Sequence, residues 1–334
     1  MTNTTSALPS SDAALGAVLG ALVGDAAGAV LEFFGRPITS ADVEHALMLP
    51  GGGTWGVAPG QVTDDGELTM SLLNALVESP AQPRAAAAHY GRWVASDPFD
   101  IGITTARSLG CLREDVWAAR ARAVGVEVAM TEAANERCMP SKANGSLMRA
   151  TPLAVWGATR GDAALVAAAQ GDARLSHPNP ACVDACTAYV LAIASLIRVP
   201  GDAARALDIA RTWTRASACD EVRGWLADAD AGVDVPYTPQ DGFVRIAFTH
   251  AFRHLRLGTT YVDALRETLA GGGDTDTNAC IVGGLVGARW GAAAIPEAMQ
   301  ASVLGCDTRR GKNPRPDMLH PRSVPEQLRV LLSA

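Results

Sequence analysis

Two clusters of oxygen-bearing side chains in the sequence could hold a metal ion. The clusters are Thr63, Asp64 and Asp65 in "GQVTDDGELTMSLL", and Asp274, Asp276 and Thr277 in "AGGGDTDTNACIVGG". Neighbouring carboxylates repel one another, and burying several of them unpaired is costly unless a cation is bound. Oxygen ligands at this density suit a hard ion such as Mg²⁺, Mn²⁺ or Ca²⁺ better than zinc. By spacing alone, the two clusters predict one metal ion or two.

Helix capping is the alternative explanation for both clusters. Asp and Thr satisfy free N–H groups at helix starts and suit the positive end of the helix dipole. Capping accounts for one or two residues in each cluster, and it remains open at this point. An EF-hand calcium loop does not fit, because Ala279 and Leu285 stand where that loop needs glycine and a bidentate glutamate.

Other motifs in the chain give weaker indications of chemistry. His250 and His254 have the spacing of a helical zinc pair, but "HAFRH" lacks the glutamate of the metalloprotease motif. Cys182 and Cys186 share that spacing, and core packing explains them better. The sequence contains no G-x-S-x-G elbow, no Walker loop and no Rossmann glycine motif.

The composition predicts a mainly α-helical globular protein. Of the 334 residues, 48% are hydrophobic and only 5% are aromatic, so strand-forming side chains are scarce while alanine is abundant. The formal net charge of -7, without any basic run, argues against nucleic acid or an anionic membrane as a partner. Seven cysteines without a C-x-x-C motif indicate reduced thiols and a cytoplasmic setting.

The apolar pattern predicts one helical domain over 13–334, preceded by a flexible N-terminal tail over 1–12. An apolar stretch over 13–31 approaches the ~20 residues that span a bilayer, but Asp25 interrupts it. Glycines every four residues in this stretch, and again from Gly283 to Gly291, predict close backbone contact between two core helices instead. Helices are expected at 13–30, 66–79, 82–95, 100–110, 146–158, 161–173, 180–197, 202–217, 220–229, 240–257, 259–270 and 277–292, with a short closing helix.

Six motifs together resemble the ADP-ribosylglycohydrolases, and the bacterial branch with the ADP-ribosyl-dinitrogen reductase hydrolases in particular. They are "GALVGDAAGAVLEF", "TDDGELT", "DPFDIGITT", "NGSLMRATPLAV", "SHPNPACVDAC" and "GGDTDTNACIVGGLVGARWG". The match runs from about Ala13 to Trp290, and its two aspartate motifs are the specific part. The resemblance implies an all-α fold formed by a single large orthogonal helical domain.

The resemblance also implies a centre of two divalent cations, Mg²⁺ or Mn²⁺. Its ligands would be Thr63, Asp64, Asp65, Asp274, Asp276 and Thr277. Such a centre is expected to hold the ribose hydroxyls beside the scissile bond and to orient a water molecule.

Two further carboxylates match catalytic positions of the family. Glu32 matches a glutamate on a mobile loop beside the metals, although by itself it reads as a charge at a helix end. Asp100 matches an acidic residue near the scissile bond in relatives that act on arginine, where a carboxylate can accept two N–H bonds from a guanidinium. Without the family, Asp100 is explained equally well as a helix cap.

Substrate-binding residues are implied in two turns. Ser141, Asn144, Gly145 and Ser146 match a turn that receives the diphosphate, and His177 matches a histidine near the phosphates and ribose. Lys142 departs from the family, since some relatives carry an aromatic residue there. An aromatic ring is expected to stack on adenine, and the candidates are Tyr237, Phe243 and Phe248.

The sequence thus predicts a metal-dependent hydrolase that removes ADP-ribose from ADP-ribosylated protein side chains, with arginine as the favoured linkage because of Asp100. ADP-ribose would be the product. The alternatives are a hydrolase of another ADP-ribose conjugate, serine- or nucleobase-linked, and a catalytically silent ADP-ribose-binding module. A generic metal-dependent phosphoesterase is disfavoured, because it leaves "NGSLMR" and "SHPNP" without a role.

Overall fold

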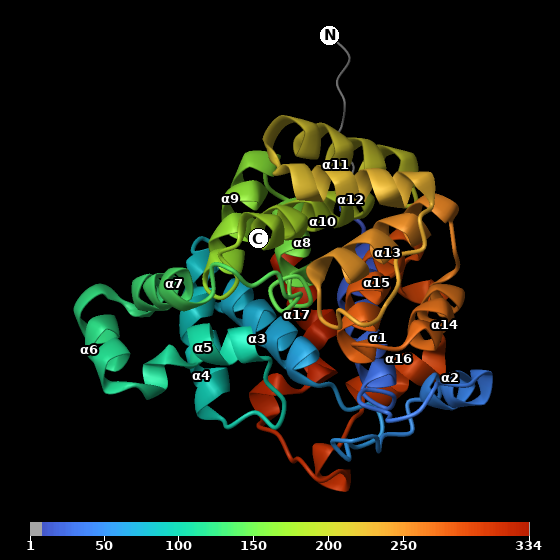
Figure 1. Ribbon diagram of the computed structural model, residues 1–334, viewed down its shortest axis with the longest axis horizontal. Coiled ribbons are helices and arrows are strands. Elements are labelled where there is room, and N and C mark those ends of the chain that lie inside the picture. Colours follow the sequence, from blue (N-terminus) through green and yellow to red (C-terminus); the bar gives the residue numbers. More distant parts are fainter. Residues whose placement is uncertain (1–8, 334) are drawn as a thin grey trace.

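The computed structural model describes residues 9–333, and these form α-helices joined by short loops and 3-10 turns (Figure 1). The only strand-like pairings among them are two isolated bridges. The helices are α1 (Ser11–Gly28), α2 (Ser40–Ala46), α3 (Asp64–Glu78), α4 (Ala86–Ala95), α5 (Ile103–Ser108), α6 (Asp115–Val124), α7 (Val126–Arg137), α8 (Thr151–Ala158), α9 (Asp162–Arg174), α10 (Pro180–Arg198), α11 (Ala203–Ser217), α12 (Asp220–Ala231), α13 (Val244–Leu257), α14 (Tyr261–Gly271), α15 (Thr275–Trp290), α16 (Glu297–Leu304) and α17 (Val324–Ser333). The predicted all-α fold is confirmed.

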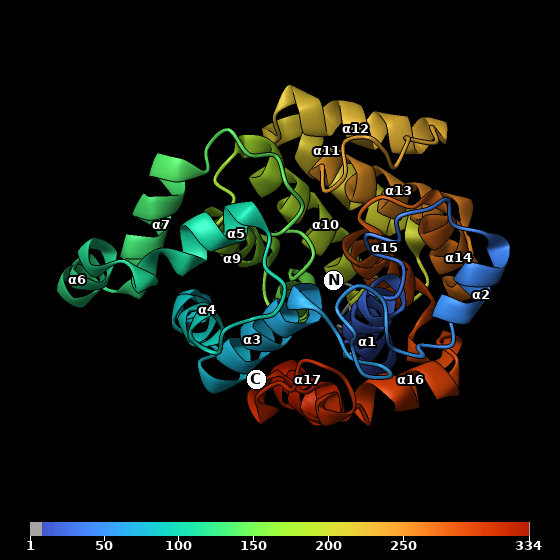
Figure 2. The same ribbon diagram turned by 60° about the horizontal axis from the view of Figure 1, so that its bottom comes forward.

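Helices α1 and α15 form the centre of the molecule, and the other helices pack around this pair. Helix α1 also contacts α3, α8, α16 and α17, while α15 contacts α10, α13 and α14. Figures 1 and 2 show α6 and α7 projecting as an arm on one side, with α2 at the opposite side. The starts of α3 and α15 meet near the middle, so this arrangement brings the two acidic clusters together.

Glycine allows α1 and α15 to touch backbone to backbone. A Cβ atom at Gly16 would lie 2.2 Å from the carbonyl oxygen of Gly287, and one at Gly20 would lie 2.5 Å from that of Gly283. At Gly24 the distance to the carbonyl oxygen of Ala279 would be 2.1 Å. No other side chain fits at these positions without moving the backbone. The predicted contact between two glycine-bearing core helices is confirmed.

Helix α10 is long and apolar enough to cross a membrane by length and composition alone. In the fold, 94% of that apolar stretch is buried against other parts of the chain. Its neighbours include α8, α9, α11 and α15. Packing within the core therefore accounts for its apolar character.

Several predicted boundaries were wrong. Helix α1 begins at Ser11, within the predicted tail, because the Ser10 side chain caps it and the Ser10 amide donates to the Ile197 carbonyl. The rest of the predicted tail, over 1–8, lies outside the described residues. Helix α8 begins only at Thr151, since 144–149 form turns. Four helices were missed from the sequence: α2, α6, α7 and α16. Helix α6 has no buried residue, so its sequence lacks the apolar repeat by which a helix is predicted.

The close contact of α1 with α15 predicts that Gly24→Ala destabilises the protein. The new methyl group would meet backbone rather than a movable side chain, so the free energy of unfolding should fall by about 1–3 kcal/mol or more. Urea denaturation measures the change. Gly224→Ala in α12 is the matched control, because a Cβ there meets nothing within 4 Å. It should be neutral or stabilising by up to about 1 kcal/mol. Equal stability of the two variants would contradict this packing.

Candidate active site

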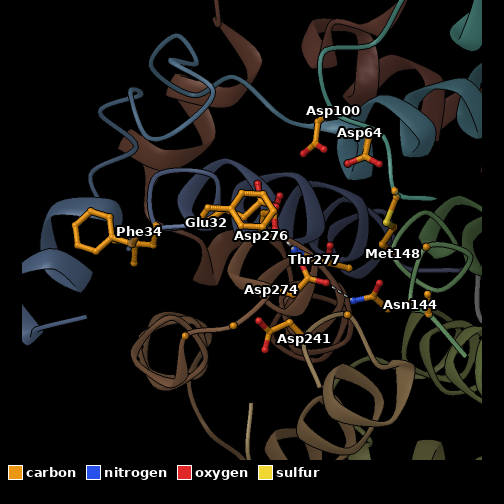
Figure 3. A pocket seen from close by; sticks show the side chains of 18 of the residues that line it. Glu32, Phe34, Asp64, Asp100, Asn144, Met148, Asp241, Asp274, Asp276 and Thr277 are labelled. Carbon is orange, nitrogen blue, oxygen red and sulfur yellow. Dashed lines mark hydrogen bonds between the residues drawn. The ribbon is translucent and has the colours of Figure 1, made fainter. Parts of the chain in front are cut away.

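A cavity of about 1240 Å³ opens where the starts of α3 and α15 meet (Figure 3). Its walls come from the loop after α1, the loop before α5, the turn before α8 and the glycines before α15. Six carboxylates line it: Glu32, Asp64, Asp100, Asp241, Asp274 and Asp276. Arg36 is the one Lys or Arg among the described lining residues, and it is paired with Asp42. The cavity is therefore strongly acidic.

Asp25 on α1 holds the start of α3 in place. Its carboxylate is fully buried and accepts hydrogen bonds from the amides of Thr63, at 3.0 Å, and Gly66, at 2.8 Å. Asp25 therefore caps α3 from another helix, and the Thr63 side chain makes no capping bond. Burial raises the pKa of Asp25 to about 7. Helix capping does not explain the first acidic cluster, because a residue outside the cluster does the capping.

The two predicted clusters meet at the Thr63 hydroxyl. Its oxygen lies 2.9 Å from Oδ1 of Asp25, 3.3 Å from Oδ2 of Asp65 and 3.3 Å from Oδ2 of Asp276. One hydroxyl proton cannot serve three carboxylates at once. Thr277 lies on the other side, with its hydroxyl 3.4 Å from the same Asp65 oxygen. Asp274 precedes α15 without capping it by its side chain.

Three carboxylates that line the cavity converge next to these buried residues: Glu32, Asp100 and Asp276. Each has a carboxylate oxygen within 4.8 Å of an oxygen of the other two. Burial is the main reason that the pKa of Glu32 rises to about 8 and that of Asp100 to about 6, and repulsion between them adds to the shift at Glu32. Figure 3 shows Asp100 and Asp64 facing the Glu32 and Asp276 side. The three carboxylates come from three separate segments of the chain.

The buried acidic residues fit a hard divalent cation. Burial and neighbouring negative charge raise the pKa of Asp64, Asp65 and Asp276 well above the ordinary value. Oδ1 of Asp65 is buried and has no hydrogen-bond partner among the described residues. Donors here are carboxylate and hydroxyl oxygens, which Mg²⁺ and Mn²⁺ prefer. The acidic cluster is therefore one that could bind a metal.

The turn before α8 lies only partly on the cavity wall. Asn144 and Gly145 line the cavity, whereas Ser146 is buried beside the thiol of Cys186 and Ser141 is hydrogen-bonded to Thr104. The predicted contact of Ser141 and Ser146 with substrate stays a prediction; Ser141 reaches the cavity wall through Thr104, which lines it. The Asn144 side-chain amide donates to Oδ2 of Asp274 at 2.7 Å. This hydrogen bond orients Asp274, a predicted metal ligand, and the predicted contact of Asn144 with substrate stays a prediction.

His177 lines the cavity next to Gly145. A Cβ at Gly145 would lie 2.9 Å from Cε1 of the imidazole, so glycine is needed for the two turns to meet. Arg149, fully buried, connects these turns by donating to the Gly145 carbonyl, at 3.0 Å, and to the Ser176 hydroxyl, at 2.9 Å. Burial and the Arg149 charge lower the pKa of His177 to about 3. His177 is therefore neutral.

The three aromatic candidates for adenine do not line the cavity. Phe248 is buried in the core, Phe243 packs on Trp225, and Tyr237 stacks on His250. The rings that line it are Phe33, Phe34 and Trp55.

The zinc alternative at His250 and His254 gains no support. The rings are 6.4 Å apart, and the one group of metal-ligating residues among the described parts of the chain is Glu32, Asp100 and Asp276. His250 instead contacts the Val235 carbonyl, at 2.8 Å.

The comparisons with known proteins identify the family of this chain. A family model described as ADP-ribosylglycohydrolase matches residues 6–320. The chain belongs to the ADP-ribosylglycohydrolase family. A solved structure described as an ADP-ribosylglycohydrolase-related protein complex shares the fold with a TM-score of 0.70 and 25% identity, over 96% of this chain and 97% of that one.

Two relatives have named activities. The ADP-ribosyl-[dinitrogen reductase] glycohydrolase of Rhodospirillum rubrum is 29% identical over 289 residues, which cover 85% of this chain and 88% of that protein. The ADP-ribosylarginine hydrolase Tri1 of Pseudomonas putida is 33% identical over 156 residues, which cover 43% of this chain and 36% of that protein.

Three residues of this ADP-ribosylglycohydrolase site were missed from the sequence. Asp25 was noted only as a charge that interrupts an apolar run, and that isolated charge was the available signal. Asp241 and Trp55 lie in loops without a distinctive pattern, so only the fold brings them to the cavity.

The C-terminal segment also supports the site through Arg315. Its guanidinium is buried and makes two hydrogen bonds to the carboxylate of Glu67, at 2.7 and 3.0 Å. It also donates to the carbonyls of Ser96 and Asp97, in the loop that leads to Asp100. Trp93 gives Glu67 one more hydrogen bond.

Arg315→Ala should destabilise the protein strongly. It leaves the buried Glu67 carboxylate without its countercharge, which costs about 3–5 kcal/mol for pairs of this kind. Thermal and urea unfolding measure the loss. Arg309→Ala is the control, because Arg309 pairs with Asp307 at the surface, where such pairs contribute about 0–1 kcal/mol. A loss at Arg315 no greater than at Arg309 would contradict the assigned role.

Proposed function

We propose that this protein is a metal-dependent hydrolase that releases ADP-ribose from arginine side chains of modified proteins. The observation that carries the proposal is the convergence of Glu32, Asp100 and Asp276 within 4.8 Å at the cavity, above the buried acidic cluster. Family membership supports a glycohydrolase. The name of the Pseudomonas putida relative supports the arginine linkage, and that of the Rhodospirillum rubrum relative supports a protein substrate.

Two divalent cations, Mg²⁺ or Mn²⁺, are part of the proposal. Thr63, Asp64, Asp65, Asp274, Asp276 and Thr277 would hold them, and Asn144 would orient Asp274. When bound, such ions supply positive charge that fixes the ribose hydroxyls and lowers the pKa of a water molecule. Glycosidases without metals cleave the bond at the anomeric carbon with two carboxylates, because positive charge develops on the sugar in the transition state. The acidic residues of this chain suit the same transition state.

Asp100 would determine the preference for arginine. Its carboxylate lines the cavity, so it can accept two N–H bonds from a guanidinium. Glu32 approaches the same point from the opposite loop. The positive charge of bound cations would lower the pKa of Glu32, and its carboxylate could then accept a proton from water as the bond to arginine breaks.

His177 and Gly145 would contact the diphosphate and ribose. Arg149 already donates to the Ser176 hydroxyl, which leaves the Ser176 proton free for Nδ1 of His177, at 2.8 Å. This arrangement favours the neutral tautomer with its proton on Nε2. The neutral Nε2–H of His177, beside Gly145, can donate to a phosphate or hydroxyl oxygen. Because it carries no charge, it does not neutralise the carboxylates nearby.

Release of ADP-ribose tests the proposal directly. The protein is incubated with an arginine-ADP-ribosylated protein in Mn²⁺ or Mg²⁺, and again after EDTA treatment and removal of the chelated metal. We expect free ADP-ribose only with metal present. A serine-ADP-ribosylated substrate is the control for linkage. Release from serine but not from arginine would refute the proposed specificity, and release from the fully metal-free protein would refute the proposed mechanism.

Two substitutions separate metal binding from turnover. Asp276→Asn removes a charge from the buried cluster and should reduce bound Mn²⁺ as well as activity. Asp100→Asn should keep bound Mn²⁺ and lower kcat, by about 100-fold or more if it handles a proton. Metal content is measured by atomic absorption after dialysis. Loss of metal in Asp100→Asn alone would reverse the assigned roles.

A further inference from the structure

Trp55 lies between the loops that carry Glu32 and Asp100. Its ring centroid is 6.3 Å from that of Phe33, which follows Glu32, and 6.0 Å from that of Phe99, which precedes Asp100. Trp55 is therefore in aromatic contact with the immediate neighbour of each carboxylate. Aromatic pairs at these distances attract one another. One side chain thus links the two loops across the cavity mouth.

The indole of Trp55 also binds Glu32 directly. Nε1 donates to Oε2 of Glu32 at 2.7 Å, and the neighbouring Thr54 hydroxyl donates to the Glu32 carbonyl at 3.0 Å. Glu32 has a carboxylate oxygen within 4.8 Å of Asp100 and of Asp276, and carboxylates at this spacing repel one another when both are ionised. A hydrogen bond to a carboxylate is stronger than one between neutral groups. The indole donor is therefore well placed to oppose this repulsion.

The Glu32 loop is buried up to Glu32 and becomes exposed at Phe33. Phe33 is 68% exposed and has a φ of +52°, a value that is costly for a bulky side chain. The backbone at Trp55 is held by hydrogen bonds from the C-terminal segment. Its carbonyl accepts a hydrogen bond from the Asn313 side chain at 2.8 Å, and the Lys312 amide donates to the Gly56 carbonyl at 2.9 Å. The Trp55 loop is thus anchored to the C-terminal segment, and Glu32 is bonded to the Trp55 loop.

We propose that Trp55 is a positioning residue that fixes the Glu32 carboxylate at the site and sets its spacing from Asp100. It acts through its indole N–H on Glu32 and through its ring on Phe33 and Phe99. The functional part of this inference rests on the proposed hydrolase activity. The structural part, that Trp55 restrains both loops, holds whatever the substrate is.

Hydrogen–deuterium exchange tests the structural part without any substrate. Trp55→Phe keeps a ring but loses the donor, so exchange in peptides covering 29–35 should become about tenfold faster. The amides of Leu31 and Glu32, which donate to the Gly28 carbonyl, report this change. Trp55→Ala should also accelerate exchange over 96–102. Trp290→Phe in α15 is the control, since it removes an indole donor to the Thr259 carbonyl and Trp290 does not line the cavity.

A double-mutant cycle tests the functional part. Trp55→Phe should lower kcat about tenfold with little change in KM, because the lost hydrogen bond serves Glu32. In a Glu32→Gln background the same substitution should change kcat less than about twofold. An equal effect in both backgrounds would show that Trp55 acts on the substrate or the fold and would overturn the inference.

The outcomes distinguish this inference from the proposed function. Unchanged exchange over 29–35 in Trp55→Phe refutes the positioning role, even in an active enzyme. Faster exchange over 29–35 in Trp55→Phe, together with a wild-type protein that releases no ADP-ribose, refutes the proposed function and leaves the restraint by Trp55 standing. If exchange over 29–35 is also faster in Trp290→Phe, loss of any indole donor loosens the protein. That result would also refute a specific role for Trp55.

Discussion

Repulsion among buried carboxylates is the constraint around which this structure is organised. Asp25, Asp64, Asp65 and Asp276 lie within one small region, and no lysine or arginine among the described residues that line the cavity neutralises them. Buried charges of one sign without compensation are unstable. Either several of these groups stay protonated or divalent cations neutralise them, and the oxygen-only donor set favours cations.

The contact between α1 and α15 keeps this repulsive cluster together. Glycine on both helices lets the backbones touch, so Asp25 on α1 and Asp276 on α15 are held by the core and cannot move apart. The same contact places Asp25 where it caps α3, which leaves the Thr63 hydroxyl turned toward three carboxylates. Arg315 and Trp55 then fix the loops with Asp100 and Glu32 around the rigid centre.

The sequence was sufficient for the features that depend on residue type and local spacing. Alanine and glycine content predicted helices and the close helix pair. The paired aspartates predicted a cation site, and the fold brings them together in an acidic cluster that could bind a metal. It was insufficient where tertiary contact decides the role. Ser146 contacts the Cys186 thiol, Asn144 donates to Asp274, and Tyr237 stacks on His250, and no local pattern indicates these contacts. Trp55 and Asp241 come to the cavity only through the fold, since nothing in their loops marks them.

Anomalous X-ray scattering from crystals of the EDTA-treated protein soaked in MnCl₂ tests whether the acidic cluster binds divalent cations. We expect manganese peaks between the starts of α3 and α15, bonded to oxygens of Asp65 and Asp276. Manganese should be absent from the same position in crystals of Asp276→Asn. A wild-type protein without manganese between these two carboxylates, or with manganese bound only elsewhere, would refute a metal centre at this cluster.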